Sequence, residues 1–133
     1  THQSLIAGRH CLLDIYGCAP DALNSQAGLD ALLRSAATRA GATVLGVLSH
    51  QFSPQGVSLV CLLAESHISI HTWPEHGSAT LDIYTCGLAC DPALACQYVI
   101  DALRPVDYVL TQLERGAPAM PMPLRARVAA TVA

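Results

Sequence analysis

The central part of the chain alternates short apolar runs with turn residues, and this pattern constrains the fold more than any other feature. Thr43 to Phe52 and Val57 to Glu65 are rich in aliphatic residues, and Ser53-Pro54-Gln55-Gly56 between them places proline and glycine as a turn requires. Two such runs joined by a short turn predict an antiparallel hairpin. Further strands are expected over His67 to Thr72 and Ser78 to Tyr84. The central segment therefore predicts consecutive strands of one antiparallel sheet.

Two helices and two outer strands are expected around these central strands. Asp21 to Ser25 has the composition of a turn and cap, and the residues after it form one apolar helical stripe that Gly41 ends: Leu29, Leu32, Leu33, Ala36 and Ala40. Asp91-Pro92 predicts the start of a second helix, which reaches about Leu103. His10 to Tyr16 and Val106 to Leu113 are expected to be strands. The segment from Gly116 to Pro123 contains three prolines and is expected to be irregular.

This order of elements predicts an α+β fold, a two-layer α/β sandwich in which a mainly antiparallel sheet carries two helices on one face. The length of 133 residues suits a single domain over residues 1–133. Only 13% of the residues are charged, against roughly 25% in an average soluble domain. Because the second face of the sheet needs a cover, we expect a homodimer.

The composition excludes several classes of function. All seven basic residues are arginines, so the chain has no lysine to hold pyridoxal phosphate or to complete a phosphate-binding Gly-Lys-Ser/Thr loop. The formal charge of −3 without a basic run argues against nucleic acid or an anionic membrane as a partner. No signal peptide is visible, and the six cysteines are interpreted as thiols, so a cytoplasmic location is expected.

One segment, Glu65-Ser66-His67-Ile68-Ser69-Ile70-His71-Thr72-Trp73-Pro74-Glu75, concentrates polar groups between apolar strands. It holds two of the six histidines, the only tryptophan and two of the three glutamates. The simplest interpretation is a polar strand face with hydrogen-bonded histidines, but such clusters are costly to bury and are expected at functional sites. A serine-hydrolase triad is disfavoured because the segment lacks Gly-x-Ser-x-Gly and its serine and histidine are too close in sequence.

The same segment, followed by Asp82-Ile83-Tyr84-Thr85-Cys86-Gly87, closely resembles the prokaryotic S-adenosylmethionine decarboxylase proenzymes, which depend on a pyruvoyl group. The resemblance covers nearly the whole chain, because it extends to these further motifs: Gly8-Arg9-His10, Gly41-Ala42-Thr43, Gly56-Val57-Ser58 and Glu114-Arg115-Gly116. It implies a self-cleaving carboxy-lyase of polyamine synthesis that converts S-adenosylmethionine into the aminopropyl donor for spermidine.

The resemblance also implies how the cofactor arises. Ser66 would attack the carbonyl of Glu65, and elimination from the resulting ester would leave a β chain of residues 1–65 and an α chain of residues 66–133. The new end at position 66 would become a covalent pyruvoyl group after loss of ammonia. In the family, the positions of His71 and Ser58 supply the base for processing and its assistant, and histidine is a common general base near neutral pH.

For catalysis, the resemblance implies that the pyruvoyl ketone forms a Schiff base with the substrate amine and accepts the electrons released with CO2. Cys86 matches the family's proton donor, and a thiol is mostly protonated near neutral pH. Phe52 matches an aromatic residue that stacks on the adenine, where a cationic sulfonium is also favoured. Glu75 is the expected partner of polar substrate atoms.

Three questions stay open at this stage. The positions of Ser66 and His71 differ by an odd number, so these residues face opposite sides of a regular strand. Either the start of the segment is bulged or turned, or processing frees the new end to move. His76 and Ser78 replace aromatic residues common in the family, which leaves a pyruvoyl-dependent decarboxylase of ornithine or arginine as an alternative. A non-catalytic binding subunit is less favoured, because the key residues are present.

A zinc module is the remaining alternative. Cys86-x3-Cys90-x5-Cys96 departs from the usual ligand spacing after its first pair and has no second knuckle, so no metal is expected. Cys90 and Cys96, like Cys11, Cys18 and Cys61, are interpreted as small packed residues.

Overall fold

The computed structural model describes residues 8–116, so the prediction for the proline-containing tail concerns residues that lie almost wholly outside the described part. The elements follow in this order: β1 (Gly8–Tyr16), α1 (Pro20–Leu23), α2 (Gln26–Arg39), β2 (Val44–Gln51), β3 (Val57–Leu63), β4 (Ser66–Trp73), the 3-10 turn η2 (Pro74–His76), β5 (Ser78–Cys86), α3 (Pro92–Leu103) and β6 (Asp107–Arg115). The six strands form one sheet in the order β2-β3-β4-β5-β1-β6, and every neighbouring pair is antiparallel.

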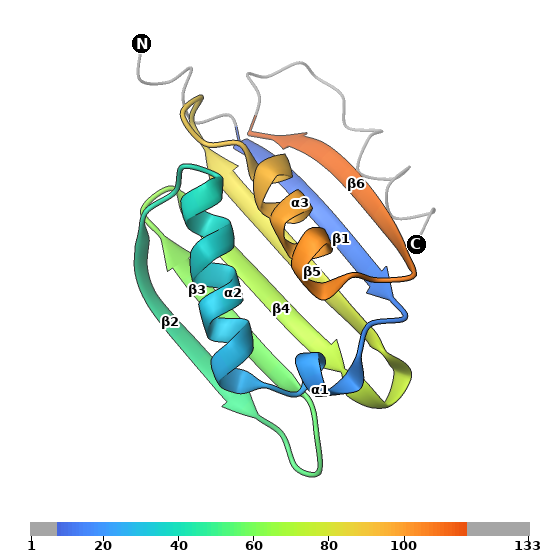
Figure 1. The fold of residues 1–133 in the computed structure, drawn as a ribbon. Coiled ribbons are helices and arrows are strands. Elements are labelled where there is room, and N and C mark those ends of the chain that lie inside the picture. The colour runs from blue at the N-terminus through green and yellow to red at the C-terminus, as the bar shows by residue number, and fades with distance from the viewer. Residues whose placement is uncertain (1–7, 117–133) are drawn as a thin grey trace.

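The molecule has two layers, because α2 and α3 lie side by side across one face of the sheet (Figure 1). The core between the layers is formed by fully buried aliphatic side chains from both: Leu13, Ile15, Leu59, Ile68, Ile70 and Ile83 from the strands, and Leu29, Leu33 and Val99 from the helices. The predicted α+β sandwich with two helices on one face is therefore confirmed, and the sheet is antiparallel throughout.

Local signals explain where the two long helices begin and end. The Ser25 hydroxyl accepts a hydrogen bond from the Gly28 amide at 3.0 Å, and the Asp91 carboxylate accepts one from the Ala93 amide at 3.1 Å. Gly41 follows α2 with a φ of +84°, the left-handed conformation that ends many helices. These caps lie where the sequence predicts them.

A short additional helix, α1, occupies a segment predicted to be a turn. Pro20 stands in its first turn, and Leu23 at its end is completely buried. The proline is already set for helical geometry, and burial of Leu23 under the sheet stabilises one turn that the local sequence alone does not favour.

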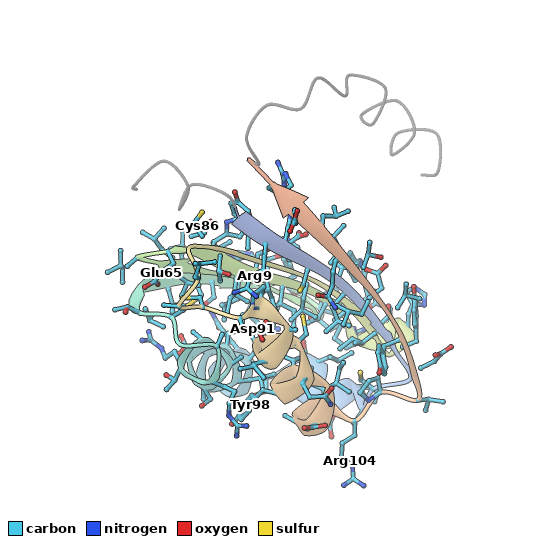
Figure 2. All side chains as sticks on the ribbon, turned by 90° about the horizontal axis from the view of Figure 1, so that it is seen from above. Arg9, Glu65, Cys86, Asp91, Tyr98 and Arg104 are labelled. Atoms are coloured by element: carbon cyan, nitrogen blue, oxygen red, sulfur yellow. The ribbon has the colours of Figure 1, made fainter. Side chains whose placement is uncertain are left out.

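The second face of the sheet carries no described helix, as Figure 2 shows from the end of the sheet. Aliphatic side chains on this face are strongly exposed: Leu48 by 79%, Leu62 by 55% and Val60 by 44%. We call this side of the sheet the open face. Within residues 8–116, no helix combines the length and the hydropathy needed to cross a membrane.

Candidate active site

The Glu65–Ser66 peptide bond lies at the entry to β4, directly beside the end of β5. The Cys86 amide donates a hydrogen bond to the carbonyl oxygen of Glu65 at 3.1 Å. The Glu65 carboxylate in turn accepts a hydrogen bond from the Thr43 amide at 3.0 Å. Figure 2 shows Glu65 and Cys86 near each other at this end of the sheet. The fold therefore holds the peptide on both sides and brings the predicted cleavage site next to Cys86.

The position of Cys86 depends on the loop that follows it. Gly8 of β1 lies opposite Cys86 in the sheet, and Arg9 beside it donates to the carbonyl of Cys90 and pairs with Asp91 at 3.8 Å. Arg9 thus ties the loop after β5 to β1 and to the start of α3. Cys86 remains partly accessible, unlike the five other cysteines, which are buried.

Ser58 and His71 form a hydrogen-bonded pair on the open face. They lie opposite each other in β3 and β4, and the Ser58 Oγ is 2.7 Å from the His71 Nδ1. Both side chains are accessible from the open face. The structure therefore brings together the two residues that the resemblance assigns to processing.

Phe52 and Glu75 lie at the same end of the sheet as this pair. Phe52 follows β2, is 46% exposed, and its ring centroid is 4.6 Å from that of His50. Glu75 is exposed in η2, which directly follows β4. His76 and Ser78, the two departures from the family pattern, belong to the same region.

The predicted site residues thus divide into two groups at opposite ends of β4. We call Glu65, Ser66 and Cys86 the cleavage group, and Phe52, Ser58, His71 and Glu75 the histidine group. Five residues of regular strand separate Ser66 from His71, which corresponds to about 16 Å along β4. The ladders that pair residues 66–73 with β5 and 67–71 with β3 contain no bulge, so a bulged start is wrong for the intact chain, which instead bends at residues 64–65 just before β4.

Residues that the sequence analysis did not single out lie next to the cleavage site on the open face. The Ser66 Oγ is 3.4 Å from the His67 Nδ1, and the His67 ring packs against His10 at 6.4 Å and Tyr84 at 5.9 Å between centroids. Arg115 adds a guanidinium 5.6 Å from the Tyr84 ring centre. His67 and Tyr84 lie in the two motifs that carry the family resemblance, so motif membership was the available signal.

The pKa values of Tyr84 and His10 are shifted by their surroundings. Burial raises the pKa of the Tyr84 phenol, and a hydrogen bond with the neighbouring Cys86 raises it further, so the phenol stays neutral beside the thiol. Burial also lowers the pKa of His10, and this outweighs the opposing effect of Asp82, whose Oδ1 lies 3.3 Å from the His10 Nε2. The Tyr84 phenol therefore adds no charge next to Cys86.

The cysteines do not gather around a metal position. All six are free thiols, and within the described range of 8–116 no three His, Cys, Asp or Glu side chains are arranged to hold a metal ion. Cys90 and Cys96 are both buried, Cys90 just before α3 and Cys96 within it.

Comparison with known proteins places this arrangement in a family. A sequence model described as S-adenosylmethionine decarboxylase matches residues 9–116. The S-adenosylmethionine decarboxylase proenzyme of Synechococcus sp. (strain WH7803) is 46% identical over 114 residues, which are 86% of this chain and 89% of the relative. The proenzyme of Methanococcus aeolicus is 44% identical over 110 residues, 83% of this chain and 94% of the relative.

Comparison with solved structures supports the same family. The crystal structure of the adenosylmethionine decarboxylase from Aquifex aeolicus superimposes with a TM-score of 0.79 at 39% identity, covering 88% of this chain and 96% of that one. The AdoMetDC-delta26 monomer of Trypanosoma brucei has a TM-score of 0.56 at 14% identity over 77% of this chain and 44% of that chain, a likeness of fold alone. The chain belongs to the S-adenosylmethionine decarboxylase family.

Proposed function

We propose that this protein cleaves itself between Glu65 and Ser66 and then decarboxylates S-adenosylmethionine. The observation that carries the proposal is the hydrogen bond from the Cys86 amide to the Glu65 carbonyl, which joins the cleavage bond to the expected proton donor. Family membership and the relatives' names as proenzymes support both the self-cleavage and the substrate.

In maturation, Ser66 is the nucleophile and the Glu65 carbonyl carbon is its target. The Cys86 amide already points at the oxygen on which negative charge develops, which is the arrangement of an oxyanion hole. Elimination then releases residues 1–65, which end at Glu65, from residues 66–133. The residues around position 66 suit a pyruvoyl group, because Ser66 is only half-buried and sits at the start of a strand that can be cut without disrupting the core.

Once formed, the pyruvoyl group supplies a ketone that binds the substrate's amine and withdraws the electron pair as CO2 leaves. This chain's own contribution is to deliver a proton. Cys86 directly follows Thr85, the residue opposite Ser66 in β5, and its side chain is partly accessible and next to the neutral Tyr84 phenol. We assign to it the protonation of the decarboxylated carbon.

We further infer that the working unit is a homodimer formed through the open face. Within one chain the histidine group is about 16 Å along β4 from Ser66, which is beyond the reach of a general base. A two-fold axis through the open face would set the histidine group of one copy against the cleavage group of the other. The exposed leucines and valines of this face would be covered by the same contact.

In this arrangement Ser58 orients His71 through their 2.7 Å hydrogen bond, and the His71 of one copy would take the Ser66 proton of the other from the side on which the Ser66 Oγ contacts His67 at 3.4 Å. Phe52 and Glu75 of the same copy would contact the adenine and the polar atoms of the substrate. The partners of the protein are then its small-molecule substrate and its own two cleaved chains. The six free thiols are consistent with a cytoplasmic location.

Intact mass spectrometry of the purified protein tests the cleavage. We expect two chains, the second lighter by one ammonia than a fragment beginning with serine, and a single uncut chain from Ser66→Ala. Product analysis with S-adenosylmethionine, ornithine and arginine tests the substrate. Release of CO2 from ornithine or arginine alone would overturn the proposed substrate while leaving the cleavage intact.

A further inference from the structure

Thr85 in β5 is buried, and its hydroxyl has no hydrogen-bond partner among the described residues. The other buried threonine, Thr72, differs in this respect. Its Oγ1 accepts from the Val57 amide at 2.9 Å and donates to the Leu23 carbonyl at 2.7 Å. Unpaired buried hydroxyls are unfavourable and rare, so the one in Thr85 requires an explanation.

The position of Thr85 supplies that explanation. Thr85 lies directly opposite Ser66 in the antiparallel pair of β4 and β5, so both side chains are on the same side of the sheet, with Cβ atoms about 4.5–5.5 Å apart. The Ser66 hydroxyl itself has only a long contact, 3.4 Å to the His67 Nδ1. A change of the Ser66 χ1 rotamer is the movement that would bring its hydroxyl from His67 to Thr85.

The charged side chain opposite Thr85 in β1 is committed elsewhere. Arg9 is the register partner of Thr85 in β1, the strand that flanks β5 on the side away from β4. Its guanidinium, however, binds the Cys90 carbonyl and Asp91. Ser66 is therefore the facing polar group that remains available to Thr85.

The residue after Thr85 acts on the same peptide. The Cys86 amide donates to the Glu65 carbonyl oxygen at 3.1 Å. Two consecutive residues of β5 thus lie opposite the two residues that react in self-cleavage: Cys86 binds the carbonyl oxygen of Glu65, and Thr85 is the register partner of Ser66.

We propose that Thr85 is a positioning residue for self-cleavage, whose hydroxyl donates a hydrogen bond to the Ser66 Oγ and holds it toward the Glu65 carbonyl carbon. The inference rests on the proposed function. In the step concerned, a bond forms between the Ser66 Oγ and the Glu65 carbonyl carbon, and the bond from that carbon to the Ser66 nitrogen breaks. The proton lost by the hydroxyl ends on the freed amine, so the product is an ester of unchanged composition.

The test compares Thr85→Val and Thr85→Ser in cell-free translation, with cleavage followed on denaturing gels. Valine has the shape of threonine without the hydroxyl, so Thr85→Val should cleave at least tenfold more slowly, the effect of one lost hydrogen bond to the nucleophile. Thr85→Ser should stay within about threefold of the wild-type rate, because it keeps the donor. Cleavage of Thr85→Val at the wild-type rate overturns the inference.

Stability measurements separate this role from a structural one. In the uncleavable Ser66→Ala background, Thr85→Val should unfold at the same or a higher temperature, because it removes an unpaired buried hydroxyl. Thr72→Val is the matched control, since it removes a hydroxyl that is fully bonded. It should lower the unfolding temperature and leave the cleavage rate within about threefold. Equal slowing by Thr72→Val and Thr85→Val would overturn the specific role of Thr85.

Hydroxylamine, which cuts esters, shows whether Thr85 acts before or after the ester between Glu65 and Ser66 forms. Because Thr85 acts before the ester forms, hydroxylamine should release no additional fragment from Thr85→Val. Rapid release would place the defect after the ester and refute the positioning role. If the wild-type chain itself does not cleave, the proposed function fails, whereas normal cleavage of both wild type and Thr85→Val rejects only this inference.

Discussion

Truncation of Leu62 should weaken the proposed dimer by a predictable amount. Leu62 lies on the open face in β3 and exposes 55% of its surface. The change from leucine to alanine removes three carbons, worth about 2.4 kcal/mol when fully buried at about 0.8 kcal/mol per carbon. Because roughly half of the side chain is still free to be covered, each copy should lose about 1.3 kcal/mol of association free energy.

The two-fold symmetry of the dimer doubles this loss, because every substitution occurs in both copies. The total of about 2.6 kcal/mol corresponds to an increase of about 80-fold in the dimer dissociation constant. Fluorescence-detected sedimentation over nanomolar to micromolar concentrations measures this constant, with the Ser66→Ala background keeping the chain uncut.

The matched control is Leu94→Ala. Leu94 is similarly exposed, at 46%, but it lies on α3, on the helix side of the molecule. Its truncation should leave the dissociation constant within about threefold. A wild-type chain that remains monomeric at micromolar concentration, or equal effects of the two substitutions, would refute the dimer through the open face.

Three further predictions concern the site. Cys86→Ala should cleave normally but decarboxylate at least about 100-fold more slowly, because it loses the proton donor. Intact mass measures the cleavage and CO2 release measures the decarboxylation, and normal turnover would show that Cys86 is not the proton donor. Mixing Ser66→Ala with His71→Ala chains during refolding should restore cleavage of the His71→Ala chain, because His71 acts across the dimer, whereas failure to complement would favour action within one chain. Burial lowers the pKa of His10, so the folded chain binds a proton at His10 more weakly than the unfolded chain does. His10 should therefore contribute stability above about pH 6.5, and this stability should be lost as the pH falls below that value through the lowered pKa of the folded chain. Thermal unfolding at pH 5.5 and 7.5 should therefore differ less in His10→Gln, and an unchanged difference would contradict the shift.

Much of the fold follows from local signals. The Ser53 to Gly56 turn fixes the β2–β3 hairpin, and the Ser25 and Asp91 side chains cap the two long helices where the sequence predicts them. These features depend on residues a few positions apart, so the sequence displays them directly. The short helix α1 escaped prediction because its one turn is stabilised by the burial of Leu23 rather than by its own sequence.

The site could be predicted only in part. The pairing of Ser58 with His71 and the approach of Cys86 to Glu65 were implied by the resemblance and are brought about by two adjacent hairpin ladders. The cluster of His10, Tyr84 and Arg115 was not predicted, because His10 and Arg115 are 105 residues apart and meet only where β1 pairs with β6. Such contacts depend on strand order, which periodicity does not encode.

The amino-acid sequence by itself determined the strand alternation, the helix caps, the absence of a lysine amine and the motif around Ser66. It also determined that Ser66 and His71 face opposite sides of a regular strand, because side chains alternate along it. Only the tertiary structure decided that β4 runs without a bulge and that the cleavage group and the histidine group lie at its opposite ends. It also decided that Thr85, whose hydroxyl is buried, lies opposite Ser66. The physical reason is that these relations are set by the register between strands and by burial under the helices, and both arise only when distant segments pack together.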